Sequence, residues 1–599
     1  MIESDSQTRT DTMAKPELDS SKKCDPANDV GQSELSTIGK LHHWFARNPF
    51  KSSLLAGALL WLAMPPFNIW PLVFLALIPW ISIISADFTV PKYLRKVWLA
   101  SWCYWAATLY FIPIPHPAMW GGWFLLSLYC SIYIAASVGL SRVLIHRLKF
   151  SKWMAIPMVW VGLEFFRVNF MTGFGLALTG HSLYKVPLAT QVADLCGAYT
   201  ISFCVVLLST FLWLGIADMK SRFSKLGCLA GAVLLLATWL GYGYYHLANS
   251  DSWAPEGSEG LSVGIIQGNI DTVFPSSEEE VQAILREKVE QYRELASSTK
   301  LHNADLDLVV WPEGKFIMDE LLEQNPVGSV GGKQYQSVNR DDLSYFFQAM
   351  QSVEDYPMQI DQPDHIYNRS AIPSIVGTAS IDEAANHKYN SALLFSSNGL
   401  VVQRYLKMQR VLIGEYIPLE RQFPFLSSLS PSGQGLTAGD SPVSFQVQAR
   451  RPTKGDRFRL CPSICFESCV PHLIRRQVAE FEGDQEHEID FLVNLSDDGW
   501  FYGQSCLDFH LANTILRSIE LRKPGIIAAN TGISAFVDGN GCMLESGPRR
   551  DTAILIHELK QDRRRSFYLK VGDIVPFVFS LMGGLALAVA IWDRFKRRS

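Results

Sequence analysis

Apolar residues in this chain gather into eight long stretches, and this pattern constrains the fold more than any other feature. Each stretch is close to the ~20 residues that a helix needs to cross ~30 Å of hydrocarbon. Seven precede a long polar region and one follows it: 51–65, 68–85, 97–113, 120–141, 153–169, 192–217, 226–247 and 574–592. We therefore predict an α-helical membrane bundle of about eight spans.

The first two stretches are short, and the helix-breaking Met64-Pro65-Pro66 lies between them. We expect a tight hairpin here. A single re-entrant segment is the alternative, and it would change the number of spans by one or two.

The loops that connect the stretches differ sharply in charge. Alternate loops and the C-terminal end carry fourteen basic residues, namely Lys92, Arg95, Lys96, Arg142, Arg147, Lys149, Lys152, Lys220, Arg222, Lys225, Arg594, Lys596, Arg597 and Arg598. The other loops, near 64–68, 113–119 and 170–191, offer only Lys185. Basic loops stay in the cytoplasm, so strict alternation predicts both termini inside and the polar region outside.

These patterns divide the chain into four parts. Residues 1–40 are polar and too poor in apolar side chains to offset their ordering entropy, which predicts a disordered cytoplasmic tail. Residues 41–250 form the membrane domain with about seven spans, 260–560 form a soluble domain, and 574–593 form the last span. The net charge of −5 gives no reason to expect nucleic acid as a partner.

Cysteine usage points to a free thiol in the soluble domain. Five cysteines lie there, at positions 461, 465, 469, 506 and 542. An odd number leaves at least one thiol free or paired outside the domain. The first three of these cysteines are spaced four residues apart, but no His lies at a matching interval, so we expect no metal site.

Short β-rich runs alternate with polar or amphipathic stretches in the soluble domain, which predicts an α/β layered sandwich. The expected strands are 261–267, 306–311, 375–378, 391–395, 491–495 and 526–529, and the expected helices are 278–297 and 507–522. Residues 319–372 have weak periodicity and many Gly, Asn, Asp and Gln. We interpret them as an insertion or a mobile lid without an assigned fold.

Three chemically useful side chains stand near the ends of expected strands. Glu313 follows Val309-Val-Trp-Pro, where Pro312 is expected to end the strand. Lys407 ends Arg404-Tyr-Leu-Lys, and Cys465 lies in Ser463-Ile-Cys-Phe-Glu at a strand-to-helix turn. Each residue alone has an ordinary structural explanation, but together they predict a cysteine-nucleophile centre.

The surrounding motifs resemble the nitrilase superfamily and, more narrowly, the apolipoprotein N-acyltransferase family, over about residues 50–593. The motifs that carry the resemblance are Trp311-Pro-Glu313, Lys407 with Gly414-Glu-Tyr-Ile-Pro418, Ile464-Cys-Phe-Glu467, Asn494-Leu-Ser-Asp-Asp-Gly-Trp-Phe501 and Ala529-Asn-Thr-Gly532. His510, Arg517-Ser-Ile-Glu520 and Arg522 extend it. The resemblance implies a nitrilase-type α-β-β-α sandwich outside the inner (cytoplasmic) membrane of a bacterium, on its periplasmic side.

The same resemblance implies the reaction. A phospholipid acyl chain would pass to Cys465 as a thioester, and then to the α-amine of a diacylglyceryl cysteine on an apolipoprotein. This is the last step of bacterial lipoprotein maturation, and it requires no cofactor. Glu313 would be the general base, and Lys407 with the backbone N–H near Phe466 would stabilise the oxyanion.

Other residues have less defined expected roles. Glu415 and Glu467 would orient Lys407 or bind substrate, although a structural role is nearly as well supported for Glu467. Trp500 and Phe501 would line an acyl channel or belong to the core. In the membrane half, Glu164 and Arg167 are three residues apart and would form an ion pair or bind a lipid headgroup.

The chain departs from the family pattern at several points. Gly175 stands where the family usually has Pro, Phe274 is the nearest aromatic to an expected Trp, and 408–413 lacks an expected Pro. The residue after the nucleophile is Phe466 instead of Tyr. Two other functions remain open: a membrane-tethered amidase acting on small amides with water, and a divergent pseudoenzyme that serves as a lipoprotein-binding scaffold.

Overall fold

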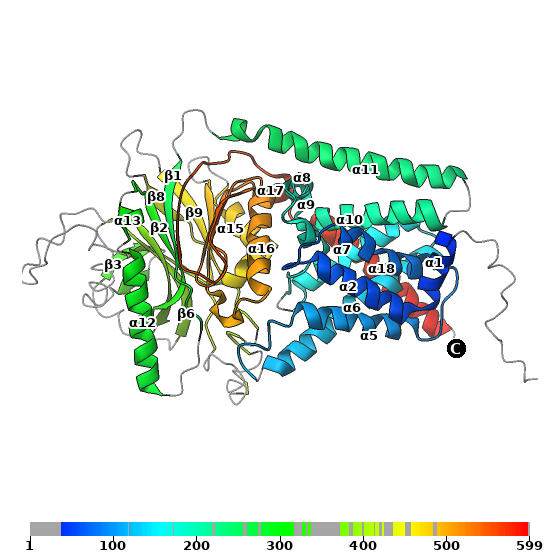
Figure 1. The fold of residues 1–599 in the computed structure, drawn as a ribbon, viewed down its shortest axis with the longest axis horizontal. Coiled ribbons are helices and arrows are strands. Elements are labelled where there is room, and N and C mark those ends of the chain that lie inside the picture. The colour runs from blue at the N-terminus through cyan, green and yellow to red at the C-terminus, as the bar shows by residue number, and fades with distance from the viewer. Residues whose placement is uncertain are drawn as a thin grey trace, which may run out of the picture.

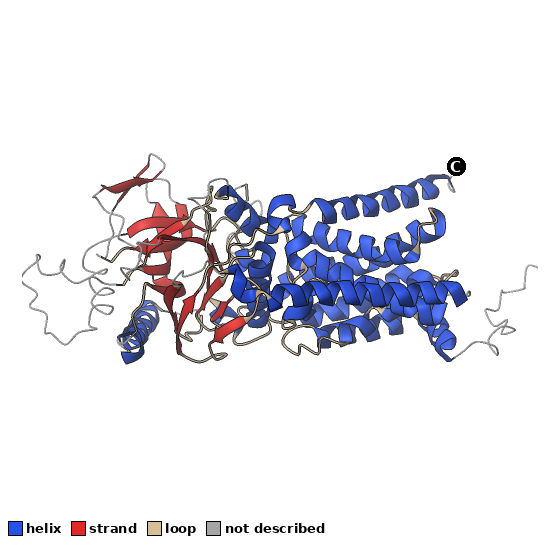
Figure 2. Cartoon of the chain, turned by 90° about the horizontal axis from the view of Figure 1, so that it is seen from above, coloured by secondary structure: helices blue, strands red, loops and turns tan. Residues whose placement is uncertain are grey.

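In the computed structural model the chain consists of a helical half and a strand-bearing half that lie end to end (Figures 1 and 2). The structure describes residues 37–596 except 118, 172, 219–221, 255–259, 273–276, 297, 303, 317–325, 331–332, 337–371, 383–386, 398–400, 413, 418–421, 424–434, 450–456 and 483–487. The expectations for Phe274, Ile413, nearly all of the 1–40 tail and most of 319–372 therefore lie outside the described residues.

Helices occupy all eight of the expected apolar stretches. They are α2 (Pro49–Ala63), α3 (Leu72–Ala76), α4 (Ile78–Ser85), α5 (Tyr93–Thr108), α6 (Met119–Arg142), α7 (Lys152–Asn169), α9 (Ala193–Cys196), α10 (Ala198–Trp213), α11 (Arg222–Ala248) and α18 (Ile574–Lys596). Two further helices, α1 (Thr37–Arg47) and α8 (Pro187–Thr190), lie outside these stretches. Within the described residues, four stretches are long and apolar enough to cross a membrane: Met119–Arg147, Ala198–Ala217, Phe223–Ala248 and Ile574–Lys596. Helices α2 and α5 and the α3–α4 pair are shorter than this, and α7 has 18 residues but carries Lys152, Glu164 and Arg167.

The first two apolar stretches form a helical hairpin. Helix α2 ends at Ala63, the chain turns through the two prolines, and α3 and α4 return against α2. The buried Trp80 on α4 donates a hydrogen bond from Nε1 to Ser53 Oγ on α2 at 3.1 Å. This contact closes the helical hairpin that was predicted from Met64-Pro65-Pro66.

The loops of the membrane half separate by charge along its long axis. The loops with few charged residues contact the strand-bearing half. Phe111, beside the loop near 113–119, packs edge-on against Phe501, and Gln191, at the end of the loop 170–191, donates a hydrogen bond to the Asn540 carbonyl. Among the basic segments, Arg147 forms an ion pair of 3.6 Å with Asp593 at the end of α18 that is remote from the strands. The two sets of loops therefore lie at opposite ends of the bundle.

The other half contains two six-stranded sheets packed face to face. The first has the order β14-β1-β2-β5-β6-β7, with β1 (Leu261–Gln267), β2 (Leu308–Phe316), β5 (Ser374–Asp382), β6 (His387–Phe395), β7 (Val401–Leu406) and β14 (Ala553–Leu559). The second has the order β13-β12-β11-β10-β9-β8, with β8 (Phe445–Gln448), β9 (Arg457–Ile464), β10 (Phe491–Ser496), β11 (Gly525–Ala529), β12 (Ala535–Val537) and β13 (Met543–Ser546).

Apolar side chains of both sheets form one core between them, including Val263, Val310, Phe458 and Val493. Helix α12 (Glu278–Ala296) covers the outer face of the first sheet, and α15 (Pro471–Glu480) and α16 (Cys506–Leu521) cover the second. This is the predicted α-β-β-α sandwich. Helix α16 lies between the second sheet and the membrane half, and every one of its residues is buried.

Two local expectations were wrong. Strand β2 does not end at Pro312 but continues to Phe316, and the proline coincides with a register shift between Val310 and Glu313 where β2 pairs with β5. Strands β12, β13 and β14 were not predicted. Strand β14 pairs antiparallel with β1, so a segment near the C-terminus forms one edge of the first sheet.

Candidate active site

Cys465 occupies a strained turn between a strand and a helix. Strand β9 ends at Ile464, and a short 3₁₀ helix runs over Cys465–Cys469. We call these five residues the nucleophile turn, after the role that the sequence predicts for Cys465. Cys465 has φ of +54°, in the left-handed region that side chains other than Gly rarely adopt. Such backbone strain costs about 1–3 kcal/mol and persists only where the surroundings enforce it.

Glu313 lies within β2, and its two carboxylate oxygens are held from different sheets, by a residue on β6 and by the residue directly after β10. Asn390 on β6 donates from Nδ2 to Oε1 at 2.5 Å, and the backbone N–H of Asp497 donates to Oε2 at 2.8 Å. The Nζ of Lys407 lies 3.9 Å from Oε1. The carboxylate is thus fixed between the two sheets, next to the lysine.

Lys407 directly follows β7 and is almost completely buried. Its Nζ donates to Glu415 Oε1 at 2.6 Å, and the other oxygen of Glu415 accepts the backbone N–H of Val411 at 2.8 Å. Glu415 therefore orients Lys407, one of the two roles that the sequence suggested for it.

Glu467 is fully buried and connects Lys407 to the nucleophile turn. Its Oε1 accepts the backbone N–H groups of Met408 and Gln409 at 2.8 and 2.9 Å. Its Oε2 accepts the Ile464 N–H at 2.7 Å and the Tyr405 hydroxyl at 2.8 Å. A carboxylate with four donors holds the segment after β7 against the nucleophile turn, which is a structural role.

The ionisation of the three central groups follows from burial and from their charges. Burial raises the pKa of Glu313, Lys407 lowers it, and Glu415 raises it; the net pKa lies above the ordinary value. Burial and Glu313 raise the pKa of Cys465 well above that of a free thiol, although Lys407 acts in the opposite direction. Burial lowers the pKa of Lys407, but Glu415 and Glu313 outweigh burial and raise it overall. The resting site therefore contains a thiol, a permanent ammonium and a carboxyl group with enhanced basicity.

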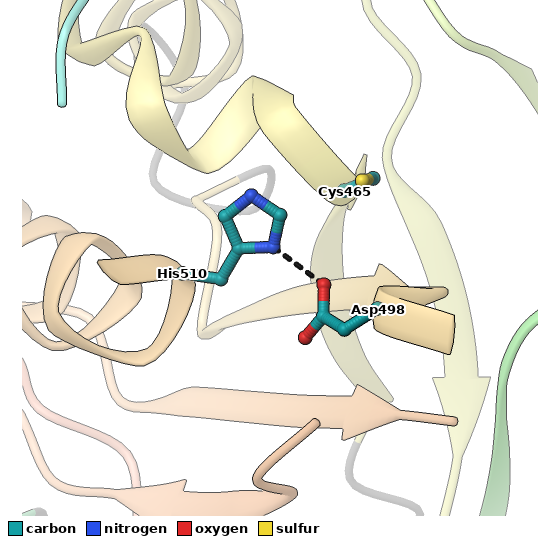
Figure 3. Close-up of side chains that lie close together, drawn as sticks. All are labelled: Cys465, Asp498 and His510. Carbon is teal, nitrogen blue, oxygen red and sulfur yellow. Dashed lines mark hydrogen bonds and ion pairs between the residues drawn. The ribbon is translucent and has the colours of Figure 1, made fainter. Parts of the chain in front are cut away.

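Two further residues beside Cys465 were quoted in the family motifs without a predicted role. His510 on α16 shares a hydrogen bond of 2.6 Å between its Nδ1 and Asp498 Oδ1 (Figure 3). One donor atom from each of Cys465, Asp498 and His510 lies within 4.8 Å of the others. Such donors suit a metal ion, and in the structure His510 Nδ1 and Asp498 Oδ1 are bonded to each other. Asn390 was missed altogether, because a single polar residue at a strand boundary gives no signal in one sequence.

The aromatic residues near the site face the membrane half. Phe466 and Phe501 are partly buried and pack against the core cluster that contains the membrane helices. Phe501 lies edge-on between Phe111, at 5.4 Å, and His510, at 6.4 Å, measured between ring centroids. Trp500 is partly exposed in the same 3₁₀ helix, Asp498–Phe501.

The membrane half reaches the nucleophile turn directly. Gly175 approaches it so closely that an added Cβ would lie 1.9 Å from the Cys469 carbonyl oxygen. The loop around Gly175 is held by Arg167, which donates to the carbonyls of Phe174 and Leu176 at 2.9 and 2.8 Å. Only a residue without a side chain fits at position 175 in this arrangement.

The expected pairing of Glu164 with Arg167 is not what the structure shows. Glu164 Oε1 instead accepts the backbone N–H and the hydroxyl of Thr179, both at 2.7 Å. Both charged side chains are buried and support the 174–179 loop.

Comparison with known proteins agrees with this geometry. The sequence family described as Carbon-nitrogen hydrolase matches residues 262–568, more than half of the chain, and the chain belongs to this family. The family described as Apolipoprotein N-acyltransferase N-terminal domain matches residues 56–211. The two matches together make the chain similar, across both halves, to the apolipoprotein N-acyltransferases.

Two individual relatives match the chain across both halves. An apolipoprotein N-acyltransferase of Rhodopirellula baltica is 26% identical over 575 residues, covering 90% of this chain and 96% of the relative. One of Geobacter metallireducens is 29% identical over 570 residues, covering 92% and 96%. Nit3 of Saccharomyces cerevisiae, a nitrilase-superfamily member of known structure, aligns at 11% identity with a TM-score of 0.32, covering 53% of this chain and 95% of Nit3.

Proposed function

We propose that this chain is an acyltransferase that moves an acyl group from a phospholipid to the N-terminal amine of a diacylglyceryl apolipoprotein. The observation that carries the proposal is the contact between Gly175 of the membrane half and Cys469 of the nucleophile turn. A thiol centre that adjoins a helical bundle suits two substrates that are both anchored in lipid. Relatives that match both halves of this chain are named apolipoprotein N-acyltransferases, and these names support the same reaction.

In the first half-reaction, Glu313 accepts the proton of the Cys465 thiol as Sγ attacks the ester carbonyl of the phospholipid. The Lys407 ammonium and the backbone N–H of Phe466 stabilise the oxyanion, an effect worth about 2.7–4 kcal/mol per donor. Glu313 then returns the proton to the departing alcohol oxygen. The product is a thioester on Cys465 and a lysophospholipid.

In the second half-reaction, the amine of the apolipoprotein attacks the thioester, and Glu313 accepts the amine proton. The thiolate departs and regains that proton, which restores the starting site. The raised pKa of Glu313 suits a group that must both accept and return a proton near neutral pH. A covalent intermediate allows two bulky lipids to use one site in turn.

We further propose that the sandwich lies on the periplasmic side of the bacterial inner membrane and that all eight apolar segments are embedded in it. The basic segment at 142–152 lies at the end remote from the sandwich, as Arg147 and Asp593 show. Basic loops remain in the cytoplasm, so the opposite end would face the periplasm. Lipid-anchored substrates on that surface could then reach the site without leaving the membrane.

Mass spectrometry of the purified protein after incubation with phospholipid tests the proposal. We expect an acyl mass on the peptide that contains Cys465, its removal by a diacylglyceryl peptide, and neither event in Cys465→Ser. Hydrolysis of small amides without phospholipid, with no acyl mass on this peptide, would instead support a membrane-tethered amidase. Absence of both activities would favour a binding scaffold.

A further inference from the structure

A chain of buried polar contacts joins the nucleophile turn to a membrane-half helix. Arg517 on α16 donates from Nη1 to the carbonyl of Ser468, within the nucleophile turn, at 3.1 Å. Its Nη2 donates to Glu520 Oε1 at 2.6 Å. The same Glu520 oxygen accepts the backbone N–H of Ala198, the first residue of α10, at 2.6 Å.

Both charged side chains in this chain of contacts are inaccessible to solvent. Arg517 is 1% exposed and Glu520 is 0% exposed. A buried ion pair contributes little net stability, because desolvation offsets much of its attraction. Its geometry is nevertheless well defined, because the planar guanidinium fixes two bonds in one rigid fork.

Each end of this chain of contacts satisfies a local structural requirement. The backbone at Cys465 is strained and needs external support, which the bond to the Ser468 carbonyl provides three residues later. At the other end, the first N–H groups of a helix lack partners within the helix, and a carboxylate satisfies one of them while complementing the helix dipole. Gly197 precedes α10 with φ of +76° and brings the helix start next to Glu520.

We propose that Arg517 and Glu520 are positioning residues that hold the nucleophile turn against the first turn of α10, so that the membrane half sets the reactivity of Cys465. Neither residue needs to contact the substrate. The inference rests on the proposed role of Cys465 as the nucleophile, and it adds that the soluble domain alone lacks a correctly placed thiol.

A second buried ion pair on α16 provides a matched control. Arg522 binds Asp194 on α9 through Nη2 and Nε, at 2.6 and 3.0 Å. This pair also joins α16 to the membrane half, and Arg522 is 1% exposed. The Arg522 guanidinium donates to residues of the 191–194 and 539–540 segments, away from the nucleophile turn.

The test compares Arg517→Lys with Asp194→Asn in the full-length protein in detergent. A lysine retains the charge opposite Glu520, but a single ammonium does not reproduce the fork that also holds the Ser468 carbonyl. For Arg517→Lys we expect acyl-enzyme formation from phospholipid to slow by about 100-fold at saturation, with KM little changed, because misplacement of a reacting group by ~1 Å costs about this factor. Alkylation of Cys465 by iodoacetamide, followed on its own peptide, should slow by at least about tenfold.

For Asp194→Asn we expect a lower unfolding temperature but Cys465 alkylation and acylation rates within about twofold of the unmodified protein. Glu520→Gln provides the same comparison if Arg517→Lys does not fold. Equal loss of thiol reactivity in the Arg517 and Asp194 variants would overturn the proposal, and so would unchanged kinetics in Arg517→Lys. The alkylation assay needs no phospholipid, so failure of the proposed acyl transfer would be recognised separately by the absence of an acyl-enzyme in the unmodified protein.

Discussion

The Glu467 carboxylate accepts the backbone N–H of Met408 at 2.8 Å, and this bond joins the two segments that carry the nucleophile and the lysine. Met408 directly follows Lys407, and Glu467 lies two residues after Cys465. The two segments come from different sheets, so nothing in their own strand pairing fixes the distance between them. A buried carboxylate performs this task.

Glu467→Gln should therefore reduce both stability and catalysis. The amide has one acceptor oxygen for four donors, and its NH₂ group would face backbone N–H groups. A buried donor left without a partner costs about 1–3 kcal/mol. We expect a lower unfolding temperature by thermal denaturation in detergent, together with slower acyl-enzyme formation. A variant with unchanged stability would contradict the structural role assigned to this residue.

Glu313→Gln should block proton transfer while leaving the fold intact. The glutamine oxygen can still accept the Asp497 N–H, and a flipped Asn390 amide can accept from the glutamine NH₂, but the amide cannot take the thiol proton. General-base catalysis contributes about 10²–10⁴-fold, and we expect acyl-enzyme formation to fall by that range. Quenched-flow mass spectrometry of the Cys465 peptide measures it. Glu480→Gln, at an exposed position of α15, is the matched control and should behave as the unmodified protein.

The candidate site was predictable from sequence where chemistry and strand ends coincide. Glu313, Lys407 and Cys465 were predicted to form one site because each stands in or directly after a β-rich run, and strands that pack in a sandwich bring such positions together. The structure places Lys407 Nζ 3.9 Å from Glu313 Oε1, and the catalytic roles stay predictions. The error at Pro312 has a local cause: a register shift lets β2 continue past the proline. The edge strand β14 was missed because its partner β1 lies almost 300 residues earlier in the chain.

The contacts that support the site were not predictable in the same way. Arg522 meets Asp194 across 328 residues of sequence, and the Asn390 bond to Glu313 spans 77. No local pattern encodes which surfaces of two domains meet. Glu467 illustrates the same point, since the sequence left three roles open for it, and the four donors around its oxygens favour the structural one.

The pH dependence of acyl-enzyme formation should report the ionisation of Glu313. The reaction needs the carboxylate form, so the rate rises with pH as Glu313 loses its proton, and this rise should lie above the ordinary glutamate pKa of 4.5 because burial raises the pKa of this group. Asn390→Leu removes a donor that favours the charged form, which raises the pKa of Glu313 further. We therefore expect the ascending limb to move to higher pH, and a shift toward lower pH would contradict the assignment of Glu313 as the base.

Gly175→Ala tests the contact between the membrane loop and the nucleophile turn. The added Cβ would lie 1.9 Å from the Cys469 carbonyl oxygen, so one of the two backbone segments must move. Overpacking of this kind costs about 1–3 kcal/mol, and here the displaced segment ends four residues from Cys465. We expect a lower unfolding temperature and slower acyl-enzyme formation.

Gly121→Ala is the control for this substitution, because an added Cβ at position 121 on α6 meets nothing within 4 Å. Alanine also favours a helix interior by about 1 kcal/mol over glycine, so this variant should be as stable as the unmodified protein or more so. If Gly175→Ala matched Gly121→Ala in stability and in acylation rate, the loop would not touch the nucleophile turn. The membrane half would then act on the site without this contact, through others such as that between α10 and Glu520.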